Sequence, residues 1–238
     1  MNRYFASISN NEIILNEDDL FHMQKVMRSK VGDKIELVIN KKAAIYEITS
    51  FSPFNARKIN DIDLNPELKN EVTLFYCLSK GDKIDFAIQK ATELGVSRII
   101  LCNSKYSVVR YDSKDIVRKM KRFKEIAKSA AEQSHRLIIP EVIGVYDIAD
   151  IKDYMGEHNF LAYEKESENH ANPTYLYEKI KENEKISIFI GSEGGFSEEE
   201  VLILNKLGFI NISLGKRILR TETAVVCALS QLNLIIEK

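Results

Sequence analysis

The sequence predicts an α/β protein with two domains: a small β-barrel-like domain over residues 1–68 and a domain with a mainly parallel sheet over residues 69–238. Two observations lead to this prediction. Short apolar runs separated by polar turns fill the first part, whereas strand and helix signals alternate from Glu71 onward. Such alternation is typical of a parallel sheet whose two faces are covered by helices.

The first domain is expected to contain four strand-like apolar runs and one helix. The runs cover residues 3–7, 13–15, 35–39 and 43–51. Asn16 is a suitable N-cap for the helix, because its side chain can accept a hydrogen bond from the first turn. An apolar stripe at helical spacing is expected to face the core of this domain. It consists of Leu20, Met23, Val26 and Met27.

The second domain is expected to alternate strands with helices. The strands are predicted over residues 72–78, 98–102, 138–143, 160–163, 186–190 and 210–214, and the helices over residues 83–94, 114–134, 147–154, 174–183, 198–207 and 222–236. Gly95 and Gly208 stand where glycines commonly end helices. Ser197 and Glu200 have the spacing of a capping box, which predicts the start of the helix that follows.

The composition excludes several classes of protein. Cys77, Cys102 and Cys227 are far apart and set among apolar residues, so we expect buried free thiols rather than a disulfide framework. The four histidines show no ligand spacing, and no metal site is predicted. No apolar run approaches the roughly 20 residues that span a bilayer, and the N-terminus lacks an apolar signal core. We therefore expect a cytoplasmic protein that binds no membrane.

A basic segment contrasts with the formal net charge of −1 for the whole chain. Between Lys105 and Lys128, nine cations accompany three acids, which gives a local charge of +6. Such a patch can bind the phosphates of a nucleic acid. The alternative is a solvated helix face, which charge alone favours.

Two loops after predicted strands have the composition of a ligand site. Residues 191–195 hold three glycines, which allow positive φ angles and a close approach of the backbone to a ligand. This loop matches neither a P-loop nor a dinucleotide-binding fingerprint. Glu193 and the three glutamates at 198–200 would repel phosphate, so we expect a neutral or cationic ligand. A glycine-rich turn without a ligand is the alternative.

The second loop, residues 215–223, combines cations, a carboxylate and hydroxyls ahead of an apolar helix. The hydroxyls of its TET triplet could cap this helix, and Glu222 suits the first turn. Arg217 and Arg220 are disfavoured beside the positive end of a helix unless an anionic group binds there. Both loops follow the carboxyl ends of strands, where open α/β sheets bind their ligands.

Several motifs occur in the order typical of one known family. IGSEGGFSEEEV and SLGKRILRTETAVVCAL lie near the C-terminus, QKATELG and AAEQS lie in the middle, and RYF and HMQKVMR lie near the N-terminus. Together they resemble the RsmE family of SPOUT methyltransferases over the whole chain. Two positions depart from the family pattern: Ser192 stands where proline is expected, and His135 stands where glycine is usual.

The resemblance implies that S-adenosylmethionine (SAM) binds in a C-terminal trefoil knot, and that the N-terminal domain is a PUA-like module that binds RNA. A sulfonium cation would suit the acidic glycine loop. Residues of three loops would bind the cofactor: Leu161, Tyr163, Gly191, Glu193, Gly194, Gly195, Leu214, Gly215, Ile218, Leu219, Thr223 and Ala224.

The implied reaction is methylation of N3 of a specific uridine in 16S ribosomal RNA of the small ribosomal subunit. Because N3 is mostly protonated at neutral pH, it must lose its proton in order to attack the methyl group. In this reading Glu222 is the general base, and Arg220 stabilises the charge that develops on the uracil oxygens.

The resemblance also suggests how the RNA is bound. Its phosphates would contact basic residues of both domains: Arg3, Lys25, Arg28, Arg110, Arg122 and Arg136. A homodimer is expected, with the assembled small subunit as the substrate. Two alternatives stay open, which are methylation of another base or of a ribose 2′-hydroxyl, and a non-catalytic RNA-binding relative.

Overall fold

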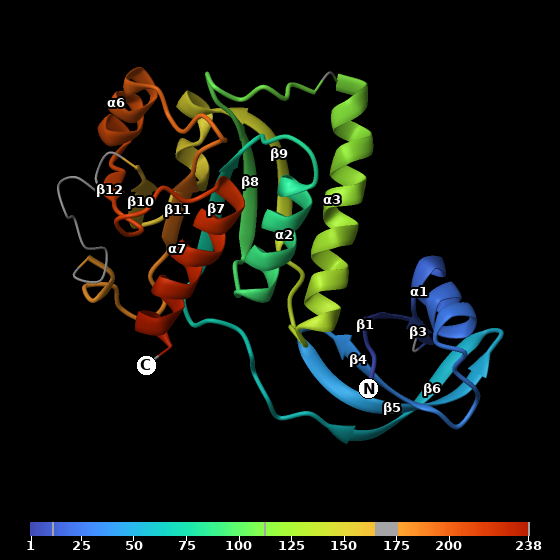
Figure 1. The fold of residues 1–238 in the computed structure, drawn as a ribbon. Coiled ribbons are helices and arrows are strands. Elements are labelled where there is room, and N and C mark those ends of the chain that lie inside the picture. Colours follow the sequence, from blue (N-terminus) through green and yellow to red (C-terminus); the bar gives the residue numbers. More distant parts are fainter. Residues whose placement is uncertain (11, 112, 165–175, 238) are drawn as a thin grey trace. The chain divides into compact units, whose positions relative to one another are not determined.

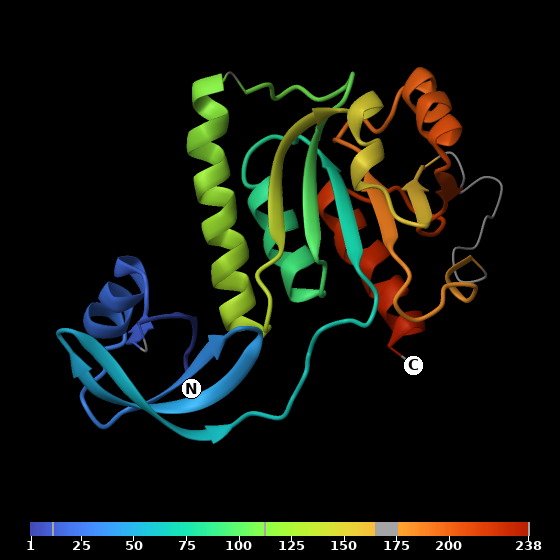
Figure 2. The same cartoon turned by 180° about the vertical axis from the view of Figure 1, so that it is seen from behind.

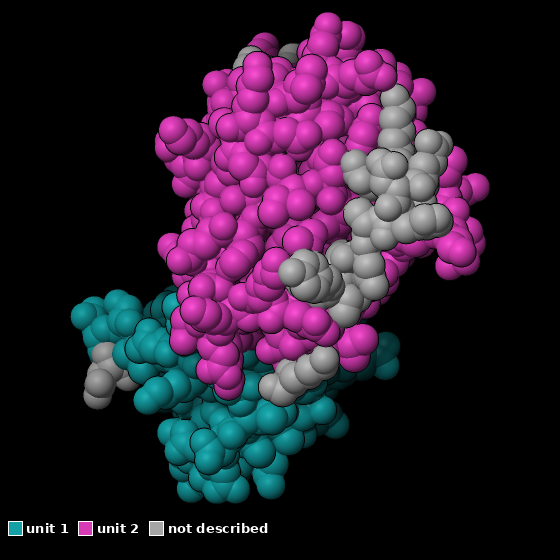
Figure 3. Space-filling view, turned by 90° about the vertical axis from the view of Figure 1, so that its left-hand side faces the viewer, with its two compact units in different colours: residues 1–67, 131–138 teal, residues 68–130, 139–238 magenta. Residues whose placement is uncertain are grey.

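The computed structural model describes residues 1–10, 12–111, 113–164 and 176–237 (Figure 1). The chain divides into two compact units, which Figure 3 shows in different colours. Unit 1 comprises residues 1–67 and 131–138, and unit 2 comprises residues 68–130 and 139–238. The second segment of unit 1 lies within the region where the sequence shows α/β alternation.

Unit 1 is rich in strands, as predicted. They form a four-stranded sheet in the order β1 (Arg3–Phe5), β4 (Lys34–Ile39), β5 (Lys42–Phe51) and β6 (Phe54–Asp61), and a hairpin of β2 (Ser7–Ser9) and β3 (Glu12–Ile14). β1 pairs with β4 in parallel, and the other described pairs are antiparallel. β6 was not predicted, because this edge strand is mostly exposed and lacks an apolar signal.

The helix of unit 1 differs from the predicted apolar stripe. After α1 (Glu17–Phe21) the chain winds as a π-helix, η1 (His22–Val26), where the N–H of Met27 donates to the carbonyl five residues back at 2.9 Å. This wider turn changes the direction of the side chains that follow. Met23 is fully buried in the core of unit 1, but Val26 and Met27 are exposed, so the predicted stripe is wrong for these two residues.

A buried ion pair fixes the second segment of unit 1. The Arg136 guanidinium donates to Glu67 Oε2 from Nε at 3.2 Å and from Nη2 at 2.5 Å, and the two side chains are 4% and 11% exposed. Glu67 Oε1 also accepts from the N–H groups of Leu137 at 2.7 Å and Ile138 at 3.1 Å. One carboxylate therefore holds three consecutive residues.

Unit 2 contains a six-stranded sheet among the described residues (Figure 1 and Figure 2). The order is β12 (Ile210–Ile212), β10 (His158–Ala162), β11 (Ile186–Ile190), β7 (Val72–Cys77), β8 (Arg98–Asn103) and β9 (Glu141–Asp147). All described pairs are parallel, which confirms the predicted sheet. β7 and β11 are buried along their whole length, as expected for strands covered on both faces.

Helices cover both faces of this sheet. Side chains of α2 (Lys83–Glu93), α3 (Ser113–Gln133) and α7 (Thr221–Ile236) pack in the apolar core on one face. Those of α6 (Glu198–Leu207) and of the 3₁₀ turn η2 (Ile148–Asp150) pack in the core on the other face. Within the described residues, no helix has the length and apolar character needed to cross a membrane.

The predicted helix ends agree with the structure. Asn16 caps α1 by accepting from the third residue of that helix at 2.7 Å. Ser197 and Glu200 form the predicted capping box of α6. Gly95 and Gly208 have positive φ angles of 88° and 103° after α2 and α6, a conformation that glycine adopts without strain.

Three predicted elements of unit 2 differ from the structure. The helix over residues 147–154 is instead two 3₁₀ turns, η2 and η3 (Lys152–Tyr154). The strand over residues 138–143 begins only at β9, because Pro140 has no N–H and Ile138 donates to Glu67. The first two residues of the helix predicted over 174–183 lie outside the described residues. Within the described part of that range, only residues 176 and 177 are helical. The trefoil knot stays a prediction.

The buried ion pair of unit 1 leads to a stability prediction. Glu67→Ala leaves the Arg136 guanidinium buried without this carboxylate, so the free energy of unfolding should fall by about 3 kcal/mol. Glu47→Ala is the matched control, because Glu47 pairs with Arg57, whose side chain is 73% exposed, and should cost less than about 1 kcal/mol. Urea unfolding measures both, and equal losses would contradict the prediction.

Candidate functional site

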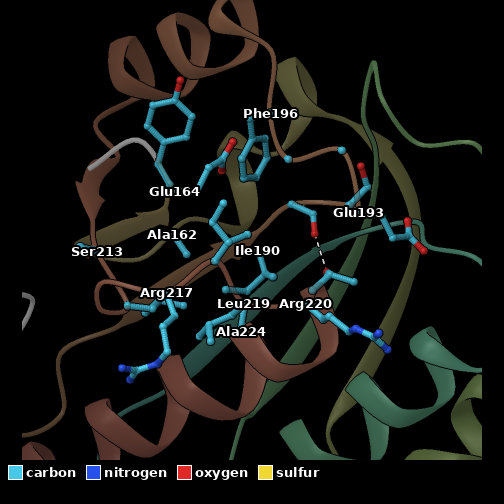
Figure 4. Close-up of a pocket in the computed structure, with 18 of the residues that line it drawn as sticks. Ala162, Glu164, Ile190, Glu193, Phe196, Ser213, Arg217, Leu219, Arg220 and Ala224 are labelled. Atoms are coloured by element: carbon cyan, nitrogen blue, oxygen red, sulfur yellow. Dashed lines mark hydrogen bonds between the residues drawn. The ribbon is translucent and has the colours of Figure 1, made fainter. Parts of the chain in front are cut away.

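A cavity of about 500 Å³ lies in unit 2 where β10, β11 and β12 end (Figure 4). Three loops that follow these strands line it, and because the strands are parallel, their carboxyl ends meet at one edge of the sheet. Lys83, at the start of α2, completes the lining. The volume is in the range typical of sites for small organic ligands.

The lining combines apolar walls with a few charged groups. The apolar part is formed by Ala162, Tyr163, Ile190, Phe196, Leu214, Ile218, Leu219 and Ala224. Glu164 and Glu193 contribute carboxylates, and Arg217 and Arg220 contribute guanidinium groups. Figure 4 shows the two arginines leaving their loop in different directions. The site can therefore enclose an apolar group and contact charged groups around it.

The glycine loop is a tight turn in which a side chain would be crowded at each of its three glycines. Gly195 has a φ angle of +67°, and a Cβ atom there would lie 2.8 Å from Glu164 Oε1. At Gly191 a Cβ would lie 3.0 Å from the ring of Phe196. The N–H of Gly195 donates to the carbonyl of Ser192 at 3.0 Å, which closes the turn. The backbone of this loop therefore faces the cavity with little side chain in front of it.

Glu193 is held by a loop that follows another strand. Its Oε1 accepts from Lys83 Nζ at 2.9 Å and from the N–H of Lys80 at 2.9 Å. Burial opposes the charged form of this carboxylate, but the bonds to the two lysines outweigh burial and lower the pKa of Glu193. This carboxylate therefore does not present an uncompensated charge to a ligand, which removes part of the sequence argument for a cationic one.

Two of the three glutamates after the loop, Glu199 and Glu200, have partners as well. Glu199 binds Lys105 Nζ at 2.9 Å, which lowers its pKa. Glu200 is buried and accepts from the N–H groups of Lys105 and Ser197, at 2.6 and 2.8 Å. These carboxylates stabilise the start of α6, so the expected repulsion of phosphate is weaker than the sequence indicated.

Most of the expected cofactor residues surround this one cavity. They are Tyr163, Gly191, Glu193, Gly194, Gly195, Leu214, Gly215, Ile218, Leu219 and Ala224, together with the expected catalytic Arg220. Leu161 is fully buried in β10 and Thr223 is exposed on α7, and neither belongs to the lining. Ser192 and Thr221 lie in the two loops expected to bind a ligand but were not named as cofactor residues, whereas Lys83 was missed because its place in the site depends on which strands are neighbours.

Glu222, the expected general base, does not line the cavity. Its Oε2 atom is buried and has no hydrogen-bond partner among the described residues. The carboxylate lies close enough to Tyr76 to help raise the pKa of that phenol, which burial and this charge bring to about 12. Arg220, two residues earlier, is by contrast exposed and belongs to the cavity lining.

Two of the expected RNA-binding residues are corrected by the structure. Arg3 and Arg136 are 6% and 3% exposed. Arg3 donates to Glu36 at 2.9 Å and to the backbone carbonyl of Arg136 at 3.3 Å, while Arg136 binds Glu67. Both guanidinium groups therefore stabilise unit 1 and cannot reach a phosphate.

The other expected RNA-binding residues are exposed. Lys25 and Arg28 lie on the surface of unit 1, and Arg110 lies on the surface of unit 2. Arg122, on α3, is exposed but forms an ion pair with Asp85 of α2. The basic segment around α3 thus keeps an exposed positive face, part of which is already paired with the protein's own carboxylates.

Comparisons with known proteins give a consistent result. A family model described as an RNA methyltransferase domain matches residues 66–233, and one described as an RNA methyltransferase PUA domain matches residues 15–53. Ribosomal RNA small subunit methyltransferase E of Bacillus subtilis is 32% identical over 246 residues, covering 98% of this chain and 96% of the relative. The enzyme of the same name from Buchnera aphidicola (subspecies Schizaphis graminum) is 33% identical, with 98% and 94% covered.

Two solved structures extend the similarity to the whole fold. A ribosomal RNA small subunit methyltransferase E from Neisseria gonorrhoeae, bound to S-adenosyl methionine, has a TM-score of 0.85 and 27% identity, with 99% of this chain and 98% of that chain covered. A methyltransferase from Legionella pneumophila in complex with SAM has a TM-score of 0.84 and 25% identity, with 98% and 96% covered.

The ion pair between Lys83 and Glu193 leads to a prediction about pH. Because the folded-state pKa of Glu193 lies below its ordinary value of 4.5, the pair contributes stability above that pH. This contribution is lost as the pH falls through the lowered pKa. In Lys83→Met the pKa of Glu193 should rise, as measured by NMR titration of the carboxyl carbon. Lys90→Met, which removes the partner of Glu93 on the same helix, is the control and should leave the Glu193 titration unchanged.

Proposed function

The chain belongs to the RNA methyltransferase family, and from this premise we propose that it transfers a methyl group from SAM to N3 of a uridine in 16S ribosomal RNA. In the numbering of the family this is uridine 1498. The observation that carries the proposal is that the loops after β10, β11 and β12 line one shared cavity, and that the exposed Arg220 belongs to this lining.

The residues of the cavity fit SAM. Apolar walls such as Ile190, Leu219 and Ala224 would cover its adenine ring, and the glycine loop would offer backbone groups for hydrogen bonds. Glu164 lies at the cavity and can compensate part of the positive charge of this ligand. When bound, SAM supplies an electrophilic methyl group on a sulfonium.

Arg220 and Glu222 are the proposed catalytic residues. The N3 atom of uridine must lose its proton, form a bond to the methyl carbon and release the thioether S-adenosylhomocysteine. A guanidinium at Arg220 would stabilise the negative charge of the deprotonated base. Glu222 would accept the N3 proton, and for this its carboxylate, which is half-buried and lies outside the cavity lining, must become accessible to the base.

The RNA would contact the exposed cations of both units. Lys25, Arg28 and Arg110 are exposed, and the positive face of α3 adds charge for phosphate binding. The proposal includes the assembled small subunit as substrate, a homodimer as the active form and a trefoil knot around the cofactor. It also includes a cytoplasmic location, which a ribosomal RNA substrate supports.

Transfer of labelled methyl to small-subunit particles that lack the modification tests this function. Incubation with labelled SAM should give 3-methyluridine as the labelled nucleoside, identified by nuclease digestion and mass spectrometry. Naked 16S ribosomal RNA is the comparison for the assembled particle. Label in another base or in a 2′-O-methyl group would contradict the proposed specificity for N3 of uridine. Absence of methyl transfer despite SAM binding would favour a non-catalytic protein.

Two variants test the catalytic roles separately from cofactor binding. Arg220→Ala and Glu222→Gln should each lower kcat by about 10²–10³-fold, because each loses a group that acts on the uridine. The Kd for SAM, measured by calorimetry, should change less than about threefold. Arg98→Ala is the control. Arg98 is the first residue of β8, so it lies at the amino ends of the strands, whereas the cavity lies at their carboxyl ends, and it pairs with Glu141. Loss of SAM binding in either variant would assign that residue to the cofactor instead.

A further inference from the structure

The peptide group between Gly191 and Ser192, where β11 enters the glycine loop, is held on its carbonyl side by α7. Thr221 Oγ1 donates to the carbonyl oxygen of Gly191 at 2.6 Å (Figure 4). Thr221 is 5% exposed, and the hydrogen bond is buried. A buried carbonyl without a donor is destabilising, so this bond strongly favours one orientation of the peptide.

The side chain of Ser192, on the other side of the same peptide, is held as well. Ser192 is 5% exposed, and its hydroxyl lies 3.3 Å from that of Ser104, which follows β8. Hydrogen bonds on both sides of the Gly191–Ser192 peptide therefore limit the orientations that it can adopt.

Tyr76 of β7 lies beside Thr221 in the core. Burial raises the pKa of Tyr76 to about 12, although its contacts with Ser79 and Thr221 oppose this, and the phenol keeps its proton at neutral pH. The single proton of the Thr221 hydroxyl is donated to Gly191, so α7 and the end of β11 are joined at this hydroxyl beside β7.

Helix capping does not account for Thr221. The N-cap residue of α7 is Arg220, which makes no side-chain capping bond in the described structure, and Thr221 is the first residue of the helix. The Thr221 hydroxyl reaches the end of a strand 30 residues earlier in the chain rather than the backbone of its own helix. Its position therefore serves the glycine loop.

From these contacts we infer that Thr221 is a positioning residue for the methyl donor: its hydroxyl fixes the Gly191 carbonyl and so orients the 191–195 loop before the cofactor binds. This inference rests on the proposed function, because it takes that loop as part of the SAM site. Three glycines in five residues would otherwise give the loop a large conformational entropy, which binding would have to overcome. The bond reduces that loss.

Calorimetry with SAM on Thr221→Val, Thr221→Ser and Thr92→Val tests the inference. Valine keeps the shape of threonine but cannot donate, whereas serine retains the hydroxyl. Thr92 is the matched control, because it is fully buried and its Oγ1 donates to the carbonyl of Ile88 at 2.7 Å, near the end of α2 away from Lys83. Thr221→Val and Thr92→Val should lower the melting temperature by similar amounts.

The expected result separates a positioning role from a purely structural one. Thr221→Val should weaken SAM binding about tenfold, while Thr221→Ser and Thr92→Val should stay within about twofold of the wild type. In the methyl transfer assay the KM for SAM should rise in parallel, with kcat changed less than about twofold. An unchanged Kd in Thr221→Val, or equal weakening in Thr92→Val, would overturn the inference.

Two further outcomes are also decisive. If the wild type binds no SAM, the proposed function fails, and the inference that depends on it fails as well. If Thr221→Val does not fold, Thr221→Ala replaces it, because this change removes the donor to Gly191 and adds no group to the core. A Kd for SAM about tenfold higher in Thr221→Ala supports the inference, and an unchanged Kd overturns it.

Discussion

Parallel pairing of β10 with both β11 and β12 is the constraint on which the site depends. It brings the residues that follow three strands to one edge of the sheet, although these residues are separated by up to about 60 positions in the chain. The burial of β7 and β11 on both faces keeps this edge in place. Without that register, the glycine loop and the loop before α7 would share no cavity.

Local chemistry predicted much of the fold. β11 and α6 have the predicted bounds, because an apolar run and a capping box are signals contained within a few residues. The π-helix after α1 was not predictable, since the apolar stripe at helical spacing also fits an ordinary helix. The 3₁₀ turns after β9 have the same cause: Ile148, Ile151 and Tyr154 recur at a spacing of three, which also fits an ordinary helix.

The site was predicted less completely than the fold, and charge explains most of the difference. The sequence shows Glu193 as an acid in a loop, but its partners Lys80 and Lys83 lie about 110 residues away. Arg3 and Arg136 likewise read as free cations until their partners in unit 1 are known. The charges in a sequence do not show which residues form ion pairs in the folded chain. An exposed cation and a buried, paired cation therefore cannot be distinguished from the sequence.

Ser192 has a consequence for which substitutions this loop can accept. Proline, which the family resemblance leads us to expect here, would stiffen the loop by its ring but has neither an N–H nor a hydroxyl. In this chain the Ser192 hydroxyl lies 3.3 Å from that of Ser104, and both residues are buried. The loop is thus held by a neighbour instead of by a ring, so Ser192→Pro would remove this contact and leave the Ser104 hydroxyl to find another one.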